Sequence, residues 1–287
     1  MLKKVWLKQP NRQEKTAILL GGFDGLHKGH QRLLEVAKSS GLPIGVMTIV
    51  GAKQENALFT LKEREEIFKN FGADFVFELL FSEIKNLSPK TFLSVLEEEL
   101  SPALFVCGED FRFGAGAVGS SKNMKDYTHV PVEIISLVEM EGVKISASHI
   151  KALLLAGQIE KANTRLGDPF FLIGEVKEDR KVGRTMGFPT ANVFYPKEKF
   201  PLKTGVYETR VVVDGKRYKG ITNYGARPTF DDQTVITETH LIDFSSDLYG
   251  REIKVEFIRY LRDVKKFENV EKLQEQLTKD IRQVRDE

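Results

Sequence analysis

Two histidines, His27 and His30, lie in the glycine-rich stretch GGFDGLHKGH of a chain that has only five histidines. An apolar run, residues 16–20, precedes this stretch, and a helical pattern follows it. Glycines between a strand and a helix let the backbone approach a phosphate, which the first amides of the helix can bind. Histidines there can stabilise charge that develops on a phosphoryl oxygen. The pattern indicates cleavage between the α and β phosphates of a nucleotide, and a structural turn with surface histidines explains it about equally well.

A second group of polar residues begins in the stretch GRTMGFPTANV. Pro189 fixes the direction of the chain, and Thr190 and Asn192 are two apart on an extended segment, so both side chains point to one face. A hydroxyl and an amide oxygen on one face can bind hydrated Mg²⁺ and a nucleotide phosphate. Glu238 lies in the strand-like stretch TVITETHLIDF, where a carboxylate can act as a general base. From the residues alone, polar side chains on edge strands remain the commoner explanation of both patterns.

The segments around the histidine turn alternate between strand-like and helical patterns. Strands that alternate with helices predict a parallel sheet that helices cover on both faces, with the histidine turn at the carboxyl end of a strand. Ser88 and Pro89 are typical of an N-cap and a first helical position. The expected strands are residues 16–20, 42–50, 74–79, 103–108 and 132–137, and the expected helices are residues 30–38, 60–72, 88–100 and 146–157.

The pattern changes after about residue 166, where extended segments follow one another without helices between them. Asp214 and Gly215 join two of these segments and are typical of a hairpin turn. Residues 268–284 carry an apolar stripe at helical spacing. The sequence therefore predicts an α/β protein whose second part is a compact antiparallel β-barrel with one terminal helix. We place the domain boundary between residues 1–166 and 167–287.

Composition narrows the class of protein. A length of 287 residues favours about two domains, and a formal net charge of +2 predicts no bulk attraction to nucleic acid or to an anionic membrane. Cys107 is the single cysteine and lies in an apolar run, which indicates an inert core thiol and a reducing compartment. We find neither a signal peptide nor a membrane-spanning stretch. These features predict a cytoplasmic protein without nucleic-acid or membrane partners, and we expect at most weak self-association.

The first half resembles a known family. GGFDGLHKGH resembles the HxGH signature of the nucleotidylyltransferase superfamily, in particular the FAD synthetase half of prokaryotic bifunctional riboflavin kinase/FAD synthetases. GEDFRFGAG resembles the loop that binds flavin and nucleotide, and ISASHIK resembles the (I/V)SSTxIR motif at another helix start. The resemblance implies a Rossmann-like nucleotidylyltransferase domain in which His27 and His30 stabilise charge on the phosphates. The residues implied for ATP are Gly22, Phe23, Asp24, Gly25, Gly29, Ser146, Ser148 and Lys151, and those implied for flavin are Asp110, Phe111 and Phe113.

The second half resembles the riboflavin kinase, or flavokinase, family. The stretches GFPTAN, NYGARPTF, ETHLIDF, DLYG and FIRYLRDVKKF match that family in order. The resemblance implies that Thr190 and Asn192 contact Mg²⁺ and the ATP phosphates and that Glu238 takes the proton from the 5′-hydroxyl of riboflavin. It also implies Gly183 at the nucleotide and Arg259 near the flavin, with Arg262 as a further candidate beside Arg259.

The first half departs from the family pattern at several positions. Gly22 and Ala117 stand where the family usually has asparagine and arginine, Lys151 replaces an arginine, and a PHP element is missing from residues 48–59. Lysine keeps the charge of arginine but loses its bidentate fork.

Together, the two resemblances predict a flavin-cofactor enzyme that makes FMN from riboflavin and FAD from FMN. A kinase whose first domain adenylylates weakly or not at all is the alternative, and a regulatory flavin or nucleic-acid binder is the rival from another class.

Overall fold

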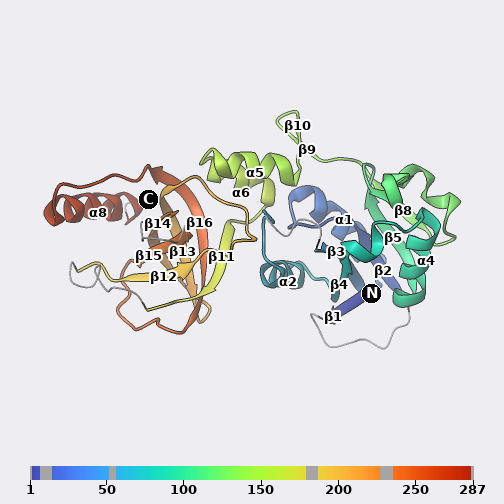
Figure 1. Ribbon diagram of the computed structural model, residues 1–287, viewed down its shortest axis with the longest axis horizontal. Coiled ribbons are helices and arrows are strands. Elements are labelled where there is room, and N and C mark those ends of the chain that lie inside the picture. Colours follow the sequence, from blue (N-terminus) through green and yellow to red (C-terminus); the bar gives the residue numbers. More distant parts are fainter. Residues whose placement is uncertain (1, 7–14, 52–55, 179–186, 227–234, 286–287) are drawn as a thin grey trace. The chain divides into compact units, whose positions relative to one another are not determined.

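The computed structural model describes residues 2–6, 15–51, 56–178, 187–226 and 235–285 (Figure 1). The chain folds into two compact units, Met1–His149 and Ile150–Glu287. The helices α5 (Ala147–Leu155), which the sequence predicts over residues 146–157, and α6 (Ile159–Leu166) belong largely to the second unit. The assignment of activities to residues 1–166 and 167–287 stays a prediction.

Six strands form the central sheet of the first unit, in the spatial order β1 (Leu2–Trp6), β4 (Phe75–Leu80), β3 (Ile44–Val50), β2 (Thr16–Leu20), β5 (Pro102–Gly108) and β8 (Val132–Ile135). The strands from β4 to β8 pair in parallel, and β1 pairs antiparallel with β4 at the edge. From β2 the chain continues to β3 on one side and later to β5 on the other. This reversal opens a crevice at the carboxyl ends of the strands, where sheets of this kind bind ligands.

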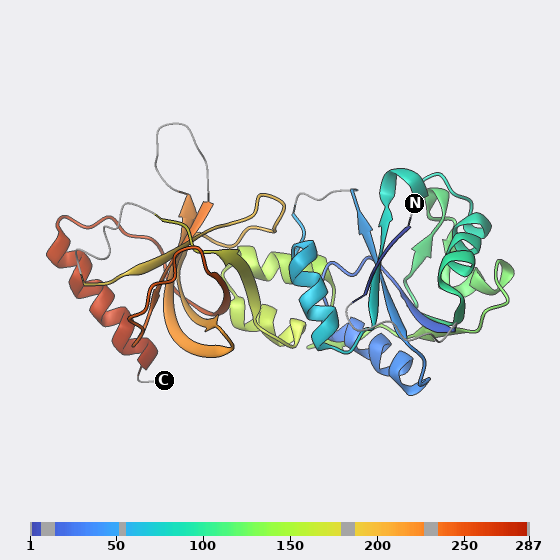
Figure 2. The same cartoon turned by 90° about the horizontal axis from the view of Figure 1, so that it is seen from below.

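Helices cover both faces of this sheet, as Figures 1 and 2 show. The helices are α1 (Lys28–Ser39) and α2 (Leu61–Asn70) on one face and α3 (Phe81–Ile84) and α4 (Pro89–Leu100) on the other. Apolar side chains of α4 pack into a core with Phe75, Phe105 and Cys107 from the sheet. Cys107 is buried, which confirms the predicted core position of this thiol. Burial raises its pKa to about 12.

Local sequence signals set where these helices begin. The Ser88 hydroxyl accepts a hydrogen bond from the Thr91 amide at the start of α4, with Pro89 at the first helical position, as predicted. Thr60 and Glu63 form a capping box at the start of α2. The short elements of the unit are β6 (Arg112–Phe113), the 3₁₀ helix η1 (Ala115–Ala117), β7 (Gly119–Ser120), the 3₁₀ helix η2 (Ser121–Asp126), β9 (Glu139–Met140) and β10 (Val143–Lys144).

Six antiparallel strands form the second sheet, in the order β11 (Phe170–Glu175), β16 (Glu252–Arg262), β13 (Gly205–Val213), β14 (Lys216–Ala226), β15 (Val235–Leu241) and β12 (Thr190–Phe194). The two edges approach each other, because the Lys177 amide donates to the Asn192 carbonyl just beyond β11. A Cβ at Gly174 would lie 2.3 Å from a methyl of Val193. The sheet therefore curls toward a barrel, which confirms the predicted antiparallel architecture.

A tight hairpin and a terminal helix complete the second unit. Asp214 and Gly215 both adopt positive φ angles, 48° and 76°, between β13 and β14. Such a turn matches the twist of the strands, and glycine adopts it without strain. The terminal helix α8 (Val270–Arg285) packs the buried Val284 against Val206 and Ile221 of the sheet. The predicted hairpin and terminal helix are both confirmed.

Candidate active sites

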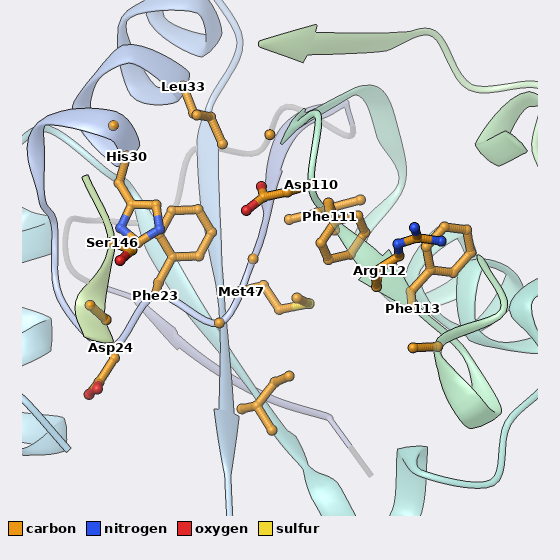
Figure 3. Close-up of a pocket in the computed structure, with 18 of the residues that line it drawn as sticks. Phe23, Asp24, His30, Leu33, Met47, Asp110, Phe111, Arg112, Phe113 and Ser146 are labelled. Atoms are coloured by element: carbon orange, nitrogen blue, oxygen red, sulfur yellow. The ribbon is translucent and has the colours of Figure 1, made fainter. Parts of the chain in front are cut away.

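A pocket of about 700 Å³ lies in the first unit at the carboxyl ends of the parallel strands (Figure 3). Figure 3 shows Phe23, His30 and Ser146 on one side of it and Phe111 and Phe113 across from them. Three separate stretches thus line one cavity, as the resemblance implies. The predicted site residues among its lining are Gly22, Phe23, Asp24, His27, Gly29, His30, Asp110, Phe111, Phe113 and Ser146.

The histidine turn is held by contacts between its own residues. His27 is the N-cap of α1, and its Nδ1 accepts a hydrogen bond from the His30 amide at 3.3 Å. Nδ1 of His30 lies 2.8 Å from the carbonyl oxygen of Gly25. The two imidazole rings stack with their centroids 3.6 Å apart, and the Phe23 ring lies 4.5 Å from that of His30. The N-cap position of a helix is usually occupied by Asp, Ser or Asn, whereas α1 has a histidine there, at the wall of the pocket.

These contacts fix which ring nitrogens carry protons. A carbonyl oxygen only accepts, so Nδ1 of His30 carries the proton in the bond to Gly25, and its Nε2 holds a lone pair in the neutral ring. Nδ1 of His27 accepts, so its proton is on Nε2. Burial lowers the pKa of His27 to about 4. Burial, with the neighbouring His27, lowers the pKa of His30 well below its ordinary value. At neutral pH the pair is therefore uncharged.

The neutral histidines predict a specific acid sensitivity. Unfolded His27 takes up a proton as the pH falls through about 6.5, whereas the folded ring stays neutral down to about 4. The unfolded state then binds more protons, so the free energy of unfolding decreases across this window, by about 3 kcal/mol from this group. Denaturant unfolding of the wild type and of His27→Gln at several pH values measures the difference. We expect a shallower pH dependence for His27→Gln, and identical slopes would contradict the neutral, buried ring.

The opposite wall of the pocket combines aromatic rings with charge. The rings of Phe111 and Phe113 are nearly parallel, with centroids 5.5 Å apart. Such surfaces suit a flat, conjugated ring system. Lys144 forms an ion pair with Asp110 at 2.5 Å, and Arg112 also lines the pocket. Neither cation is among the residues predicted for the site, although Arg112 lies within the GEDFRFGAG stretch and Lys144 directly precedes ISASHIK.

The ISASHIK stretch contributes unequally to this pocket. The Ser146 hydroxyl accepts a hydrogen bond from the His149 amide at 3.3 Å, at the start of α5, and Ser146 lines the pocket. Ser148 is an exposed residue inside α5, and the Lys151 ammonium lies 5.4 Å from the ring centroid of Phe200. Neither Ser148 nor Lys151 is among the residues that line the described pocket.

Two departures from the family pattern fall on the pocket wall. Gly22 is exposed, and a Cβ built on it would meet no atom within 4 Å, so the position itself has room for a longer side chain. Ala117 lines the pocket with a φ of 57°, a conformation that side chains rarely adopt. Gly25 does not line the pocket but supplies the carbonyl that holds His30.

Hydrogen bonds of Asp24 and of the buried Arg64 connect the histidine turn to neighbouring segments of the first unit. The Asp24 carboxylate accepts a hydrogen bond from the Leu58 amide at 2.9 Å. The buried Arg64 guanidinium donates to the Thr48 hydroxyl at 2.8 Å. Burial lowers the pKa of Arg64, and Asp24 and Glu78 act in the opposite direction. The charges near the turn are thus paired inside the unit.

The second group of predicted residues lies across three neighbouring strands of the second unit. Asn192 on β12 is directly opposite Glu238 on β15, and Glu238 is directly opposite Asn223 on β14. Thr190 is opposite His240 in the adjacent row. Residues opposite each other in an antiparallel pair project to the same face. The structure therefore brings the side chains of Thr190, Asn192 and Glu238 together on one face of the sheet.

His240 fixes the stretch that leads into β12. Nδ1 of His240 lies 2.9 Å from the Pro189 carbonyl, and the Phe188 ring meets the imidazole edge to face at 5.6 Å. These contacts connect the GFPTAN stretch to β15. The contact joins residues 51 positions apart, so the role of His240 in holding Pro189 is apparent only from the structure.

The remaining predicted residues of the second unit have other partners or lie outside the described residues. Arg259 on β16 forms an ion pair with Glu208 on β13 at 3.0 Å. Arg262 forms one with the buried Asp280 on α8 at 2.7 Å. Gly183 falls in a segment that the structure does not describe.

The donor atoms of the second site fit a magnesium ion. A hydroxyl, an amide oxygen and a carboxylate oxygen are hard donors of the kind that Mg²⁺ prefers. Within the described ranges, no group of three or more His, Cys, Asp or Glu side chains could hold a metal. At Mg²⁺ sites, waters and substrate phosphates commonly complete the coordination that one or two protein side chains begin. Thr190 and Asn192 are the residues that would hold the ion.

Comparisons with known proteins match both halves of the chain. The family model described as FAD synthetase matches residues 9–149, and the one described as riboflavin kinase matches residues 166–287. A bifunctional riboflavin kinase/FMN adenylyltransferase from Bacillus subtilis (strain 168) is 33% identical, with 93% of this chain and 91% of the relative covered. The enzyme of the same name from Escherichia coli (strain K12) is 32% identical, with 93% and 91% covered.

A solved structure also resembles the whole chain. It is described as a macrolide-efflux protein from Streptococcus pneumoniae, is 30% identical, covers 98% of this chain and 97% of its own, and has a TM-score of 0.87. None of the helices in the described part of the chain combines the length and apolar composition that a bilayer crossing requires. Both family models and the curated relatives describe flavin enzymes instead. The chain therefore belongs to the family of bifunctional riboflavin kinases and FMN adenylyltransferases.

Proposed function

We propose that this chain makes FAD from riboflavin in two steps, each in its own unit. The second unit phosphorylates riboflavin with ATP to give FMN and ADP, and the first unit transfers AMP from ATP to FMN to give FAD and pyrophosphate. The observation that carries this proposal is the presence of two separate groups of site residues, each on the fold that its family model requires. Riboflavin, FMN and ATP are the small-molecule substrates.

In the kinase reaction, Glu238 accepts the proton of the riboflavin 5′-hydroxyl, which then attacks the γ-phosphorus of ATP. Thr190 and Asn192 would hold Mg²⁺ and contact the ATP phosphates, and the ion would neutralise charge on the phosphate oxygens. Phosphoryl transfer depends mostly on positioning and charge neutralisation, so few side chains are needed. The cross-strand alignment of Asn192 with Glu238 supports this division of roles.

In the adenylylation reaction, an FMN phosphate oxygen attacks the α-phosphorus of ATP directly, and pyrophosphate leaves without a covalent enzyme intermediate. His27 donates from Nε2 to a phosphate oxygen, and His30 holds the turn through Gly25. Gly22, Gly29 and the amides at the start of α1 line the phosphate subsite. Phe111 and Phe113 offer their rings to the flavin, and Asp110 lies at the same wall.

A separation of flavins tests the proposal. Purified protein is incubated with ATP and Mg²⁺ and either riboflavin or FMN, and the products are resolved by chromatography. We expect FMN and then FAD from riboflavin, and FAD from FMN. If neither flavin is converted, the proposal is wrong. The same separation with Mg²⁺ removed by a chelator should show neither product, because the phosphates then lose their counter-charge.

The alternative function is a riboflavin kinase whose first unit adenylylates weakly. The observations that favour it are Gly22 and Ala117 on the pocket wall and the position of Lys151 away from that pocket. FMN without FAD at any protein concentration would establish it.

A cytosolic location belongs to the main proposal, because ATP, the second substrate of both steps, is a cytosolic nucleotide. Weak self-association stays a prediction.

A further inference from the structure

Asn223 begins the stretch NYGARPTF and is a polar residue at the kinase site, although it is not among the residues predicted for that site. It lies on β14 directly opposite Glu238 of β15, in the same row as Asn192 of β12. An amide therefore faces the carboxylate from each neighbouring strand. This row continues through Val206 to Arg262 at one end.

The contact between Asn223 and Glu238 has a defined direction. Nδ2 of Asn223 lies 3.4 Å from Oε2 of Glu238 and donates to it. Turning the amide over would place its carbonyl oxygen against a carboxylate oxygen, and two acceptors repel each other. The amide nitrogen is therefore the atom that faces Glu238.

The other end of the same amide has no hydrogen-bond partner among the described residues. Oδ1 of Asn223 is buried, and no hydrogen-bond donor from the described residues reaches it. A buried acceptor without a partner costs folding free energy, so such groups are rare and recur where a site must be completed by a ligand. The stability of the fold alone does not account for an amide at this position.

We propose that Asn223 is a positioning residue for riboflavin phosphorylation, which holds Oε2 of Glu238 so that Oε1 is free to take the substrate proton. This inference rests on the proposed kinase function. The role of Asn223 is exerted through Glu238, since the amide itself has no proton to exchange at neutral pH.

Among the described residues, the charged and titratable groups near Glu238 have other partners. On the same face, His240 donates to the Pro189 carbonyl, and Arg262 is paired with Asp280. Lys177, which bridges to Asn192 from beyond β11, is paired with Glu175 at 2.8 Å. In the part of the chain that the structure describes, the contact from Asn223 is thus the one hydrogen bond between neighbouring strands that orients this carboxylate.

Asn223→Ala and Asn223→Asp test the inference in the full-length protein, with riboflavin, ATP and Mg²⁺ as substrates. We expect Asn223→Ala to lower the kcat of FMN formation about tenfold or more while the KM for riboflavin changes little, as for a group that acts on the reactive step. Asn223→Asp places a second carboxylate beside Glu238, and the acidic limb of the kcat–pH profile should move up by about one pH unit. Thermal unfolding of the same samples, compared with the wild type, reports whether the second unit is folded, because FAD formation from FMN depends on the pocket of the first unit.

Two comparisons separate positioning from a structural role. In a Glu238→Gln background, adding Asn223→Ala should lower kcat no further, because both substitutions remove the same function. Thr222→Val, at the buried neighbouring position on the opposite face, should leave the acidic limb unchanged. A full additional loss in the double variant, or an unmoved limb in Asn223→Asp, would overturn the inference. Absence of FMN formation by the wild type would instead overturn the proposed kinase function.

Discussion

Replacing Glu238 by glutamine is expected to lower the rate of FMN formation by about 10²–10⁴-fold, the contribution that a general base makes to a proton transfer. The substitution keeps the shape of the side chain and the alignment with Asn192 and Asn223. It removes the carboxylate that we propose as the acceptor of the 5′-hydroxyl proton. The change should appear in kcat, since the amide can still occupy the same space beside the substrate.

FAD formation by the Glu238→Gln protein serves as an internal control for its FMN formation. FAD formation from added FMN should stay within about twofold of the wild type, because the adenylylation pocket lies in the other unit. Glu252→Gln, at an exposed glutamate on β16 of the second unit, should leave both reactions unchanged. Equal losses of FMN and FAD formation in Glu238→Gln would show that the two sites are not separable.

Replacing His30 by alanine is expected to abolish FAD formation while FMN formation continues at the wild-type rate. The His30 ring stacks on His27, contacts Phe23 and binds the Gly25 carbonyl, so its loss disturbs both the donor and the turn that presents it. Loss of a preorganised donor to a phosphoryl oxygen costs about 10²–10³-fold in rate. The lost ring contacts add to this effect.

Measurement of both reactions in one sample distinguishes this outcome from unfolding. FMN formation should be unchanged in His30→Ala, and thermal unfolding should show that the first unit still folds. His129→Ala, at an exposed histidine of the same unit outside the pocket, is the matched control and should retain both activities. FAD formation at the wild-type rate by His30→Ala would contradict the role of the histidine turn.

The sequence predicts the strands and helices well where their patterns are strong. Apolar runs locate β2, β3 and β5, and the hairpin at Asp214 and Gly215 follows from turn chemistry alone. The edge strand β1 was not predicted, because the stretch LKKVW combines two lysines with only five residues and shows no clear period. Pairing with β4, which is far along the chain, decides that this segment is a strand.

Some residues of the candidate sites could be predicted from the sequence, and others could be found only from the structure. His27, His30, Thr190, Asn192 and Glu238 lie in short stretches whose residue types suggest their chemistry, and the structure brings each group together. Residues that matter through register or packing were not visible in the sequence. The pairing of Asn223 with Glu238, the contact of His240 with Pro189 and the charge of Lys144 beside Asp110 all join segments distant in the sequence. Protonation states of the histidines likewise required the contacts of their ring nitrogens.

The central claim is that two pockets in one chain work independently on ATP and a flavin. Mixing two blocked variants tests it most directly: Glu238→Gln and His30→Ala are each incubated alone with riboflavin, ATP and Mg²⁺, and then together, and the flavins are separated. We expect almost no FAD from either protein alone and substantial FAD from the mixture, since FMN made by one is adenylylated by the other. A mixture that forms FMN but no FAD, although Glu238→Gln converts added FMN, would contradict the account.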